Sequence, residues 1–481
     1  MLFNSFEFAI FLPIVFGLYW FILAKNLKLQ NLFVLISSYV FYGWWDSRFL
    51  ILIFLSSFFD FIIGQKIYSS NVERTRRALL GLSLAFNLGM LGVFKYFNFF
   101  AQNLSDALSS IGIQNSPYFF SIALPVGISF YTFQTLSYSI DIYRKNLKPT
   151  DDWIAFFAFV SFFPQLVAGP IERAKNLLPQ FYQLRHFSYA ESVKGMRQIL
   201  WGLFKKVAIA NNCALYVDLI FAAPDTYSSP ILILGSILFA FQIYCDFSGY
   251  SDIAIGTARL FGFNLMQNFA YPYFSRDIAE FWRRWHISLS TWFRDYVYIP
   301  LGGSRVTKAK VIRNIFVIFI VSGFWHGANW TFIVWGALNG LYFLPQWIGE
   351  NNRANVDTIA AHAYLPSLTE LVQVLFTFCL TCLAWIFFRA ESMSHAIEYI
   401  WYILQMRGAE HNSLDLFIGF NRLILLYIVV MIVMEWRNRR QLFGLSQISR
   451  YPGVRWSVYI VLSMVIIQYF NSDQEFIYFQ F

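Results

Sequence analysis

The sequence contains few charged residues. Asp, Glu, Lys and Arg together make up 13% of its 481 residues, whereas 58% of the residues are hydrophobic and 21% are aromatic. Because soluble domains carry about 25% charged residues, this scarcity excludes an ordinary soluble protein and predicts an all-α membrane protein with many spans. The formal net charge of +9 does not indicate nucleic-acid binding in such a protein, since Lys and Arg collect in cytoplasmic loops.

Cysteine is also scarce, with four residues in the chain. Cys379 and Cys382 form a C-x-x-C pair, but the surrounding segment FTFCLTCLAWIFF supplies no further metal ligand, so we expect small helix residues and no metal site. The N-terminal segment lacks the basic region and the A-x-A site of a cleaved signal peptide. The first apolar segment is therefore expected to remain as a span.

Long apolar stretches, by contrast, recur along the whole chain. A span of the bilayer needs about 17 to 25 apolar residues, and we predict roughly eleven spans in one domain covering residues 1–481. The basic connections should lie in the cytoplasm, which places the N-terminus outside. The predicted spans are near residues 6–24, 29–45, 49–65, 78–100, 118–140, 200–222, 230–258, 314–349, 371–388, 421–436 and 456–470.

Two segments depart from this pattern. The segment 153–169 is apolar, but basic connections flank it on both sides and Pro164, Gly169 and Pro170 interrupt it. This pattern predicts a re-entrant loop or a helix in the membrane interface. Irregular backbone at membrane depth persists only when it is buried in protein or lines a cavity, so this segment indicates an internal site. The arginine-rich stretch 269–313 is expected on the cytoplasmic side, with an interfacial helix over residues 280–293.

The longest uncharged stretch, 314–349, contains His326. As one helix its 36 residues would measure about 54 Å against a hydrocarbon core of about 30 Å, so the segment must be steeply tilted or broken. Counted from Arg313, His326 lies about 20 Å along the helix, within the membrane. Intramembrane ionisable residues are usually functional, so we expect a functional role for His326 ahead of a hydrogen bond that merely ties two helices together.

His286 is the second candidate. It lies among tryptophans in EFWRRWHISLSTWF, and it is either functional or an ordinary residue of the membrane interface. The neighbouring Arg283 and Arg284 are candidates for binding phosphates or anionic lipid headgroups.

Two carboxylates interrupt a third apolar segment, QIYCDFSGYSDIAIG. Asp246 and Asp252 need partners near a membrane core, and they could orient a histidine or pair with an arginine. The alternative, which we favour over direct catalysis, is a helix break around Gly249 that Asp246 caps.

Six segments together carry a more specific signal: MLFNSFEFAIFLPIVFGLYW, SFFPQLVAGPIERA, QIYCDFSGYSDIAIG, FWRRWHISLSTWFRDYVYIPLGG, SGFWHGANWTFIVWGALNG and the terminal EFIYFQF. Over essentially its whole length the chain resembles the membrane-bound O-acyltransferase (MBOAT) family, in the branch that contains bacterial alginate O-acetyltransferase and related polysaccharide or peptidoglycan acetylation proteins. The resemblance implies helices around a central tunnel that joins the cytoplasmic and outer faces. It also implies that His326, in the W-H-G-x-x-W element, is catalytic and that His286, in the W-H-I-S-L-S element, is a second functional residue.

The resemblance implies a reaction as well. An acetyl group would pass from cytoplasmic acetyl-CoA across the bacterial inner membrane to a hydroxyl group of an extracytoplasmic polysaccharide or peptidoglycan, or to a periplasmic partner acetyltransferase that works with export machinery. No bound cofactor, metal or nucleic acid is implied. Neutral His326 would take the proton of the attacking hydroxyl, unless an acyl-histidine forms first. Asn329 would hydrogen-bond the oxyanion, with Trp325 and Trp330 beside the substrate.

Two other functions stay open at this point. The D-alanyl transfer proteins of teichoic-acid modification resemble the same plan and share the tunnel histidine, but they take the acyl group from a carrier protein. The terminal EFIYFQF favours the acetyl branch. A transporter also needs broken helices and buried polar residues, although the sequence shows no paired repeats and one deep histidine.

Overall fold

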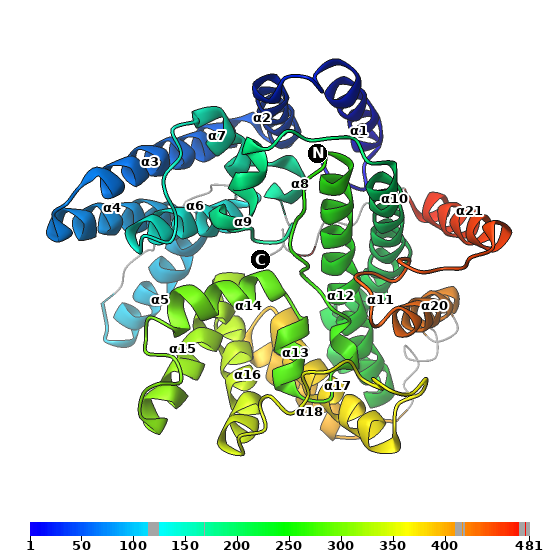
Figure 1. Ribbon diagram of the computed structural model, residues 1–481. Coiled ribbons are helices and arrows are strands. Elements are labelled where there is room, and N and C mark those ends of the chain that lie inside the picture. Colours follow the sequence, from blue (N-terminus) through cyan, green and yellow to red (C-terminus); the bar gives the residue numbers. More distant parts are fainter. Residues whose placement is uncertain (114–124, 168, 409–415, 417–418, 471–476, 478–481) are drawn as a thin grey trace. The chain divides into compact units, whose positions relative to one another are not determined.

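The computed structural model describes residues 1–113, 125–167, 169–408, 416, 419–470 and 477, and helices are the regular secondary structure of these residues (Figure 1). The prediction of an all-α fold is confirmed. The chain divides into two compact units, one made of Met1–Gly195 with Ala254–Met266 and the other of Met196–Ile253 with Gln267–Phe481. The single domain expected from the sequence stays a prediction.

The first unit contains the N-terminal helices. Two helices, α10 (Tyr189–Leu203) and α12 (Ser229–Leu260), contain residues of both units. The other helices of the first unit are α1 (Phe6–Gly17), η1 (Leu18–Ile22), α2 (Leu27–Gly43), η2 (Ser47–Phe49), α3 (Leu50–Ser69), α4 (Glu73–Leu91), η3 (Gly92–Tyr96), α5 (Phe97–Ser110), α6 (Ile128–Tyr143), α7 (Trp153–Ser161), α8 (Phe163–Leu166), α9 (Ala174–Leu177) and η4 (Leu178–Tyr182).

The second unit contains both histidines of the predicted site. Several of its helices are shorter than a span, and the stretch η5 is a π-helix. Its helices are η5 (Phe204–Ala210), α11 (Asn211–Ala222), η6 (Pro224–Thr226), η7 (Pro272–Phe274), α13 (Ile278–Arg284), α14 (Ile287–Phe293), η8 (Arg294–Tyr298), α15 (Lys308–His326), α16 (Trp330–Ile348), α17 (Leu368–Arg389), α18 (Met393–Leu404), α20 (Leu423–Arg437) and α21 (Pro452–Tyr469).

The described helices account for the predicted spans in part. Within the described ranges, five helical stretches are long and apolar enough to cross a membrane: Ser47–Ser69, Glu73–Ser110, Ser229–Leu260, Lys308–His326 and Leu368–Arg389. The expected total of roughly eleven is not confirmed, because the other predicted spans correspond to shorter or less apolar helices. One end differs clearly: the span predicted over 78–100 continues as helix to Ser110. The start of the span predicted at 118 lies outside the described residues.

Capping side chains set where several helices begin. The Asn26 side chain accepts from the backbone N–H of Leu29 at the start of α2, and Ser367 and Glu370 form a capping box at the start of α17. These bonds satisfy N–H groups that have no partner within the helix.

A buried polar network joins α3, α4 and α6 in the first unit. Both carboxylate oxygens of Asp60 accept hydrogen bonds, from Ser83 at 2.5 Å, from Asn87 at 2.6 Å and from Ser139 at 2.8 Å. Because a buried carboxylate is costly unless it is hydrogen-bonded, this network fixes the relative positions of the three helices.

The segment 153–169 is broken, as its prolines and glycine predict. Helix α7 ends at Ser161, and the short α8 follows with Pro164 in its first turn. A Cβ atom at Gly169 would collide with the backbone of Gln165. The irregular backbone is buried in protein, which agrees with the physical requirement at membrane depth. Whether the segment is re-entrant stays a prediction.

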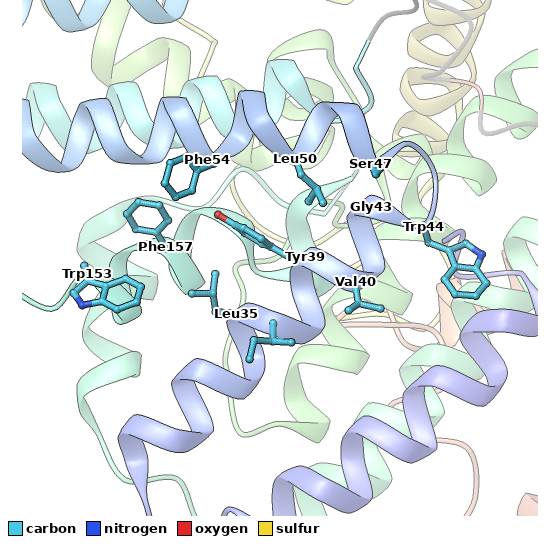
Figure 2. A pocket seen from close by; sticks show the side chains of 11 residues that line it. Leu35, Tyr39, Val40, Gly43, Trp44, Ser47, Leu50, Phe54, Trp153 and Phe157 are labelled. Atoms are coloured by element: carbon cyan, nitrogen blue, oxygen red, sulfur yellow. The ribbon is translucent and has the colours of Figure 1, made fainter.

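An apolar groove of about 590 Å³ lies between α2, α3 and α7 in the first unit. In Figure 2 the Tyr39 hydroxyl points toward Phe54 and Phe157, while Trp44 and Trp153 lie at opposite ends of the lining. The groove contains none of the predicted site residues, so the candidate site lies elsewhere.

Candidate active site

The uncharged stretch 314–349 is broken rather than one tilted helix. Helix α15 ends at His326, and α16 begins at Trp330 after the turn at 327–329. The two helices pack side by side (Figure 1). Of the two alternatives that its length left open, a steep tilt or a break, the structure shows the break. It places His326 at the inner end of α15, where 3% of its surface is exposed.

Glycines allow the close contact between these two helices. A Cβ atom at Gly323 would collide with the carbonyl oxygen of Phe332, and one at Gly336 would collide with that of Phe319. Small residues at a helix interface let the backbones approach closely, which is a common source of helix association in membranes. The glycines around His326 therefore have a packing role.

Aromatic rings surround His326. Its imidazole centroid lies 5.0 Å from that of Trp325, 5.3 Å from Trp335 and 5.3 Å from Phe388. The second predicted histidine is also nearby, because the ring centroids of His326 and His286 are 6.3 Å apart. Trp325 contacts both, with 6.1 Å between its ring centroid and that of His286. The structure thus brings three predicted site residues together.

His286 lies at a break between two short helices, and the single interfacial helix predicted over 280–293 is wrong. The backbone of His286 has a φ of 44° between α13 and α14. Asn268 stabilises the break: its carbonyl oxygen accepts from Ile287 N at 2.9 Å, and its side-chain oxygen accepts from Ser288 N at 3.3 Å. These bonds satisfy the first N–H groups of α14 and offset the strained conformation.

The surroundings of His286 keep its imidazole neutral. The side chain is 1% exposed, and the ring of Phe247 packs edge-on with 4.6 Å between centroids. Burial lowers the pKa of His286 to about 3. Its Nδ1 lies 3.1 Å from Asn268 Oδ1, whereas its Nε2 has no hydrogen-bond partner among the described residues.

Asp246 and Asp252 lie on α12, which runs through Gly249 without interruption. The predicted helix break is therefore wrong. The carboxylates are paired with lysines: Lys206 Nζ is 2.6 Å from Asp246 Oδ1, and Lys205 Nζ is 2.7 Å from Asp252 Oδ2. The expected need for partners is met by side chains that the sequence analysis did not consider. A role of these carboxylates in orienting a histidine stays a prediction.

Gly249 serves helix packing in place of a break. A Cβ atom at Gly249 would lie 2.7 Å from the carbonyl oxygen of Gly202, and one at Gly202 would lie 2.5 Å from that of Gly249. This close approach brings the π-helix η5, with its two lysines, against the carboxylates of α12. The backbone N–H of Ile477 also donates to Asp246 Oδ2 at 2.8 Å, so one described residue of the terminal EFIYFQF motif contacts this cluster.

Arg283 and Arg284 stabilise surrounding segments of the chain. Arg283 donates to the carbonyl oxygens of Asn352 and Asn355, each at 2.7 Å. Arg284 donates to Glu280 Oε1 at 2.7 Å. Arg283 therefore holds the segment that follows α16, and Arg284 stabilises α13, the helix that contains it. Phosphate binding by these arginines stays a prediction.

Asn329 and Trp330 lie at the start of α16. Asn329 Oδ1 accepts from Thr331 N at 3.1 Å, and its Nδ2 donates to the carbonyl oxygen of Glu391 at 2.9 Å. Trp330 is 53% exposed. Asn329 thus caps a helix, and its amide donor is used within the protein. The predicted contacts of both residues with substrate are untested.

A second apolar cavity, of about 590 Å³, lies in the same unit as the histidines. Tyr244 and Tyr273 line it, and their ring centroids lie 6.1 and 6.0 Å from that of Trp285, next to His286 in the chain. The predicted tunnel to His326 stays a prediction. In the described part of the chain, no group of three or more His, Cys, Asp or Glu side chains could hold a metal ion.

Comparison with known proteins decides the family. The profile of the membrane-bound O-acyltransferase family matches residues 150–384, which include both histidines. A probable alginate O-acetylase from Pseudomonas aeruginosa is 38% identical over 464 residues, which cover 94% of this chain and 83% of the relative. The chain belongs to the membrane-bound O-acyltransferase family. It is an O-acyltransferase of the membrane, as the sequence predicted.

Other relatives within and beyond the acetyl branch are also similar. A peptidoglycan O-acetyltransferase from Helicobacter pylori is 33% identical over 533 aligned positions, covering 100% of this chain and 98% of the relative. A teichoic acid D-alanyltransferase from Bacillus subtilis is 28% identical over 291 residues, covering 56% of this chain and 70% of the relative. The similarity to proteins named for O-acetylation is therefore both higher and more extensive.

Several residues of this acyltransferase site were not found from sequence. Trp335 and Phe388 contact His326, but aromatic residues are too frequent in the chain for these two to be selected. Lys205 and Lys206 could have been found from sequence, because two adjacent lysines inside a predicted span need partners with negative charge. Asn268 could not, since it lies 18 residues before His286 in an irregular segment.

Proposed function

We propose that this chain transfers an acetyl group from cytoplasmic acetyl-CoA, across a bacterial inner membrane, to a hydroxyl group on the outer side. The pair of buried imidazoles, His286 and His326, carries the proposal, because their ring centroids lie 6.3 Å apart in the two motifs that the family resemblance singled out. The relatives named for alginate and peptidoglycan O-acetylation support acetyl as the group and a polysaccharide as the acceptor class.

The proposed chemistry needs one neutral base. The hydroxyl oxygen attacks the thioester carbonyl while neutral His326 takes the hydroxyl proton, a role that contributes about 10² to 10⁴ in rate. The new C–O bond forms, the C–S bond breaks, and the proton passes from His326 to the departing thiolate. The attacking hydroxyl and the thioester supply all the reacting atoms, so the route requires no resident cofactor. Transfer through an acyl-histidine would use the same residue.

The immediate acceptor is either the glycan itself or a periplasmic partner acetyltransferase that works with polysaccharide export. In the first case purified protein with an oligosaccharide is sufficient for transfer. In the second case transfer needs the partner, and the protein alone releases coenzyme A slowly. Both versions use the same donor and the same histidine.

Reconstitution in liposomes tests the proposal. Purified protein receives radiolabelled acetyl-CoA on one side and mannuronate oligosaccharides or peptidoglycan fragments on the other, and coenzyme A release and labelled glycan are measured. We expect His326-dependent release of coenzyme A, with His326→Ala as the matched inactive control. Transfer from a D-alanyl carrier protein in place of acetyl-CoA would identify the protein as a D-alanyltransferase. Substrate uptake without acyl transfer would identify a transporter.

A further inference from the structure

Asn268 is the central hydrogen-bonding residue beside His286. Its side chain is fully buried, and its Oδ1 accepts from the Ser288 backbone N–H at 3.3 Å and from the Ser288 hydroxyl at 2.8 Å. The same oxygen lies 3.1 Å from His286 Nδ1. On the other side Asn268 Nδ2 donates to Ser251 Oγ at 3.1 Å.

This network determines which imidazole nitrogen carries the proton. A backbone N–H can only donate, so the Asn268 atom that faces Ser288 N must be the oxygen and not the amide nitrogen. His286 Nδ1 faces that same oxygen, and it can bond to it only as an N–H donor. In a neutral imidazole the other nitrogen then holds the lone pair. His286 therefore presents Nε2 as a hydrogen-bond acceptor.

The Nε2 atom is available for a ligand. It is buried and has no hydrogen-bond partner among the described residues. The Ser288 hydroxyl also lies 3.5 Å from Nδ1, but it donates its proton to Asn268 Oδ1 at 2.8 Å, and the Asn268 amide group is oriented by Ser251. Among the described residues whose rings pack against His286, His326 is the titratable one, at 6.3 Å between ring centroids. A buried acceptor without a partner is costly in an empty site, and a bound substrate with a donor would remove that cost.

We propose that Asn268 is a positioning residue, which fixes His286 in the tautomer whose Nε2 accepts a hydrogen bond from an O–H or N–H group of the substrate beside the reacting carbonyl. The inference rests on the proposed function in placing substrate at this pair. It assigns His286 to substrate binding as a neutral acceptor and leaves the proton transfer to His326.

The variant Asn268→Asp tests this role. The carboxylate has the same shape and accepts from the same donors, but it favours protonated His286 and so raises the pKa of that imidazole. As the pH falls below the raised pKa, Nε2 gains a proton and becomes a donor. We expect the ratio of variant to wild-type kcat to fall about tenfold per pH unit below that pKa. The ratio to wild type removes the effects of pH that both proteins share.

Two further variants make the result specific. Asn438→Asp is the matched control, since Asn438 is equally buried and bonds to the backbone of Gly444 and Gln447, and its ratio should not change with pH. Asn268→Leu removes the acceptor, and we expect kcat to fall at least about tenfold at all pH values while KM for acetyl-CoA stays within about twofold. A pH-independent ratio for Asn268→Asp, or wild-type kcat for Asn268→Leu, would overturn the proposal.

A spectroscopic measurement on the wild-type protein tests the tautomer of His286 directly. It does not depend on whether a variant at position 268 folds. In protein labelled with ¹⁵N-histidine, the resonances lost in His286→Ala identify His286. We expect a protonated Nδ1 and an unprotonated Nε2 down to pH 5, and the opposite tautomer would overturn the inference. This result does not depend on acetyl transfer, so failure of the proposed function and failure of the Asn268 role are distinguishable.

Discussion

The imidazole rings of His286 and His326 lie with their centroids 6.3 Å apart, although the two residues come from different helix ends. His326 is the last residue of α15, and His286 immediately precedes α14. Both positions depend on a helix break, which directs each ring into the same buried space. The pair is therefore a product of interrupted helices rather than of one helix face.

His326→Ala should reduce kcat for acyl transfer by about 10² to 10⁴, because it removes the proposed base. If both histidines serve one transition state, the double variant with His286→Ala should lose little more than the more severe single variant. The rate of acetyl transfer in liposomes gives kcat for the single and the double variant. The exposed His362→Ala is the control and should keep wild-type kcat. Full turnover in folded His326→Ala would contradict the catalytic assignment.

Gly323→Ala should destabilise the second unit, because the added Cβ collides with the Phe332 carbonyl and pushes α15 from α16. Overpacking of this kind costs about 1 to 3 kcal/mol. Thermal unfolding in detergent, followed by fluorescence size-exclusion chromatography, measures the shift. The matched control is Gly81→Ala on α4, where a Cβ meets no atom within 4 Å. If Gly323→Ala and Gly81→Ala were equally stable, the helices would have to accommodate the added Cβ at no cost, and the prediction would be contradicted.

Lys206→Met should destabilise the protein by about 3 to 5 kcal/mol, because it leaves the Asp246 carboxylate buried without its counter-ion. Adding Asp246→Asn should recover most of the loss, since the amide is neutral and still accepts from Ile477 N. Unfolding in a denaturing detergent measures both. Lys194→Met breaks an exposed pair with Glu191 and should change stability by less than about 1 kcal/mol. If the double variant were no more stable than Lys206→Met, the ion pair between Lys206 and Asp246 would not be the cause of the loss.

Glu172→Gln should stabilise the first unit increasingly as the pH rises. Burial raises the pKa of Glu172 from 4.5 to about 7, while Met266 N donates to its carboxylate. Between these two values the folded state holds a proton that the unfolded state has lost, so the free energy of unfolding falls as pH rises. The advantage of the glutamine variant should therefore grow from pH 5 to pH 7, to at most ~3 kcal/mol.

Unfolding of both proteins at several pH values checks this prediction. Glu191→Gln, at an exposed position, is the control and should change stability by less than about 1 kcal/mol at each pH. A constant difference between Glu172→Gln and the wild type would mean that Glu172 is ionised in the folded protein throughout.

The lengths of the apolar segments and the residues that interrupt them predicted the parts of the fold that depend on one segment alone. The excess length of 314–349 predicted a steep tilt or a break, and the structure has a break next to His326. Pro164 likewise predicted the interruption between α7 and α8. In both cases the constraint lies within the segment itself.

What the sequence did not predict depends on partners from distant segments. The His286 break follows from bonds to Asn268, which no local pattern marks. Gly249 suggested a helix break, whereas its glycine character serves contact with Gly202 on another helix. A glycine that breaks a helix and a glycine that lets two helices pack closely look the same in the local sequence. Only the residue that the glycine contacts distinguishes the two roles.

The lysine–carboxylate pairs also constrain how the chain enters the membrane during synthesis. A lone lysine at the centre of an inserting helix costs about 2.5 to 3.5 kcal/mol, and η5 contains two in succession. Their counter-ions are on α12, which follows α11 after the short turn η6. We therefore expect Lys205 and Lys206 to pair with Asp252 and Asp246 as soon as α12 has been synthesised, before the C-terminal helices are made.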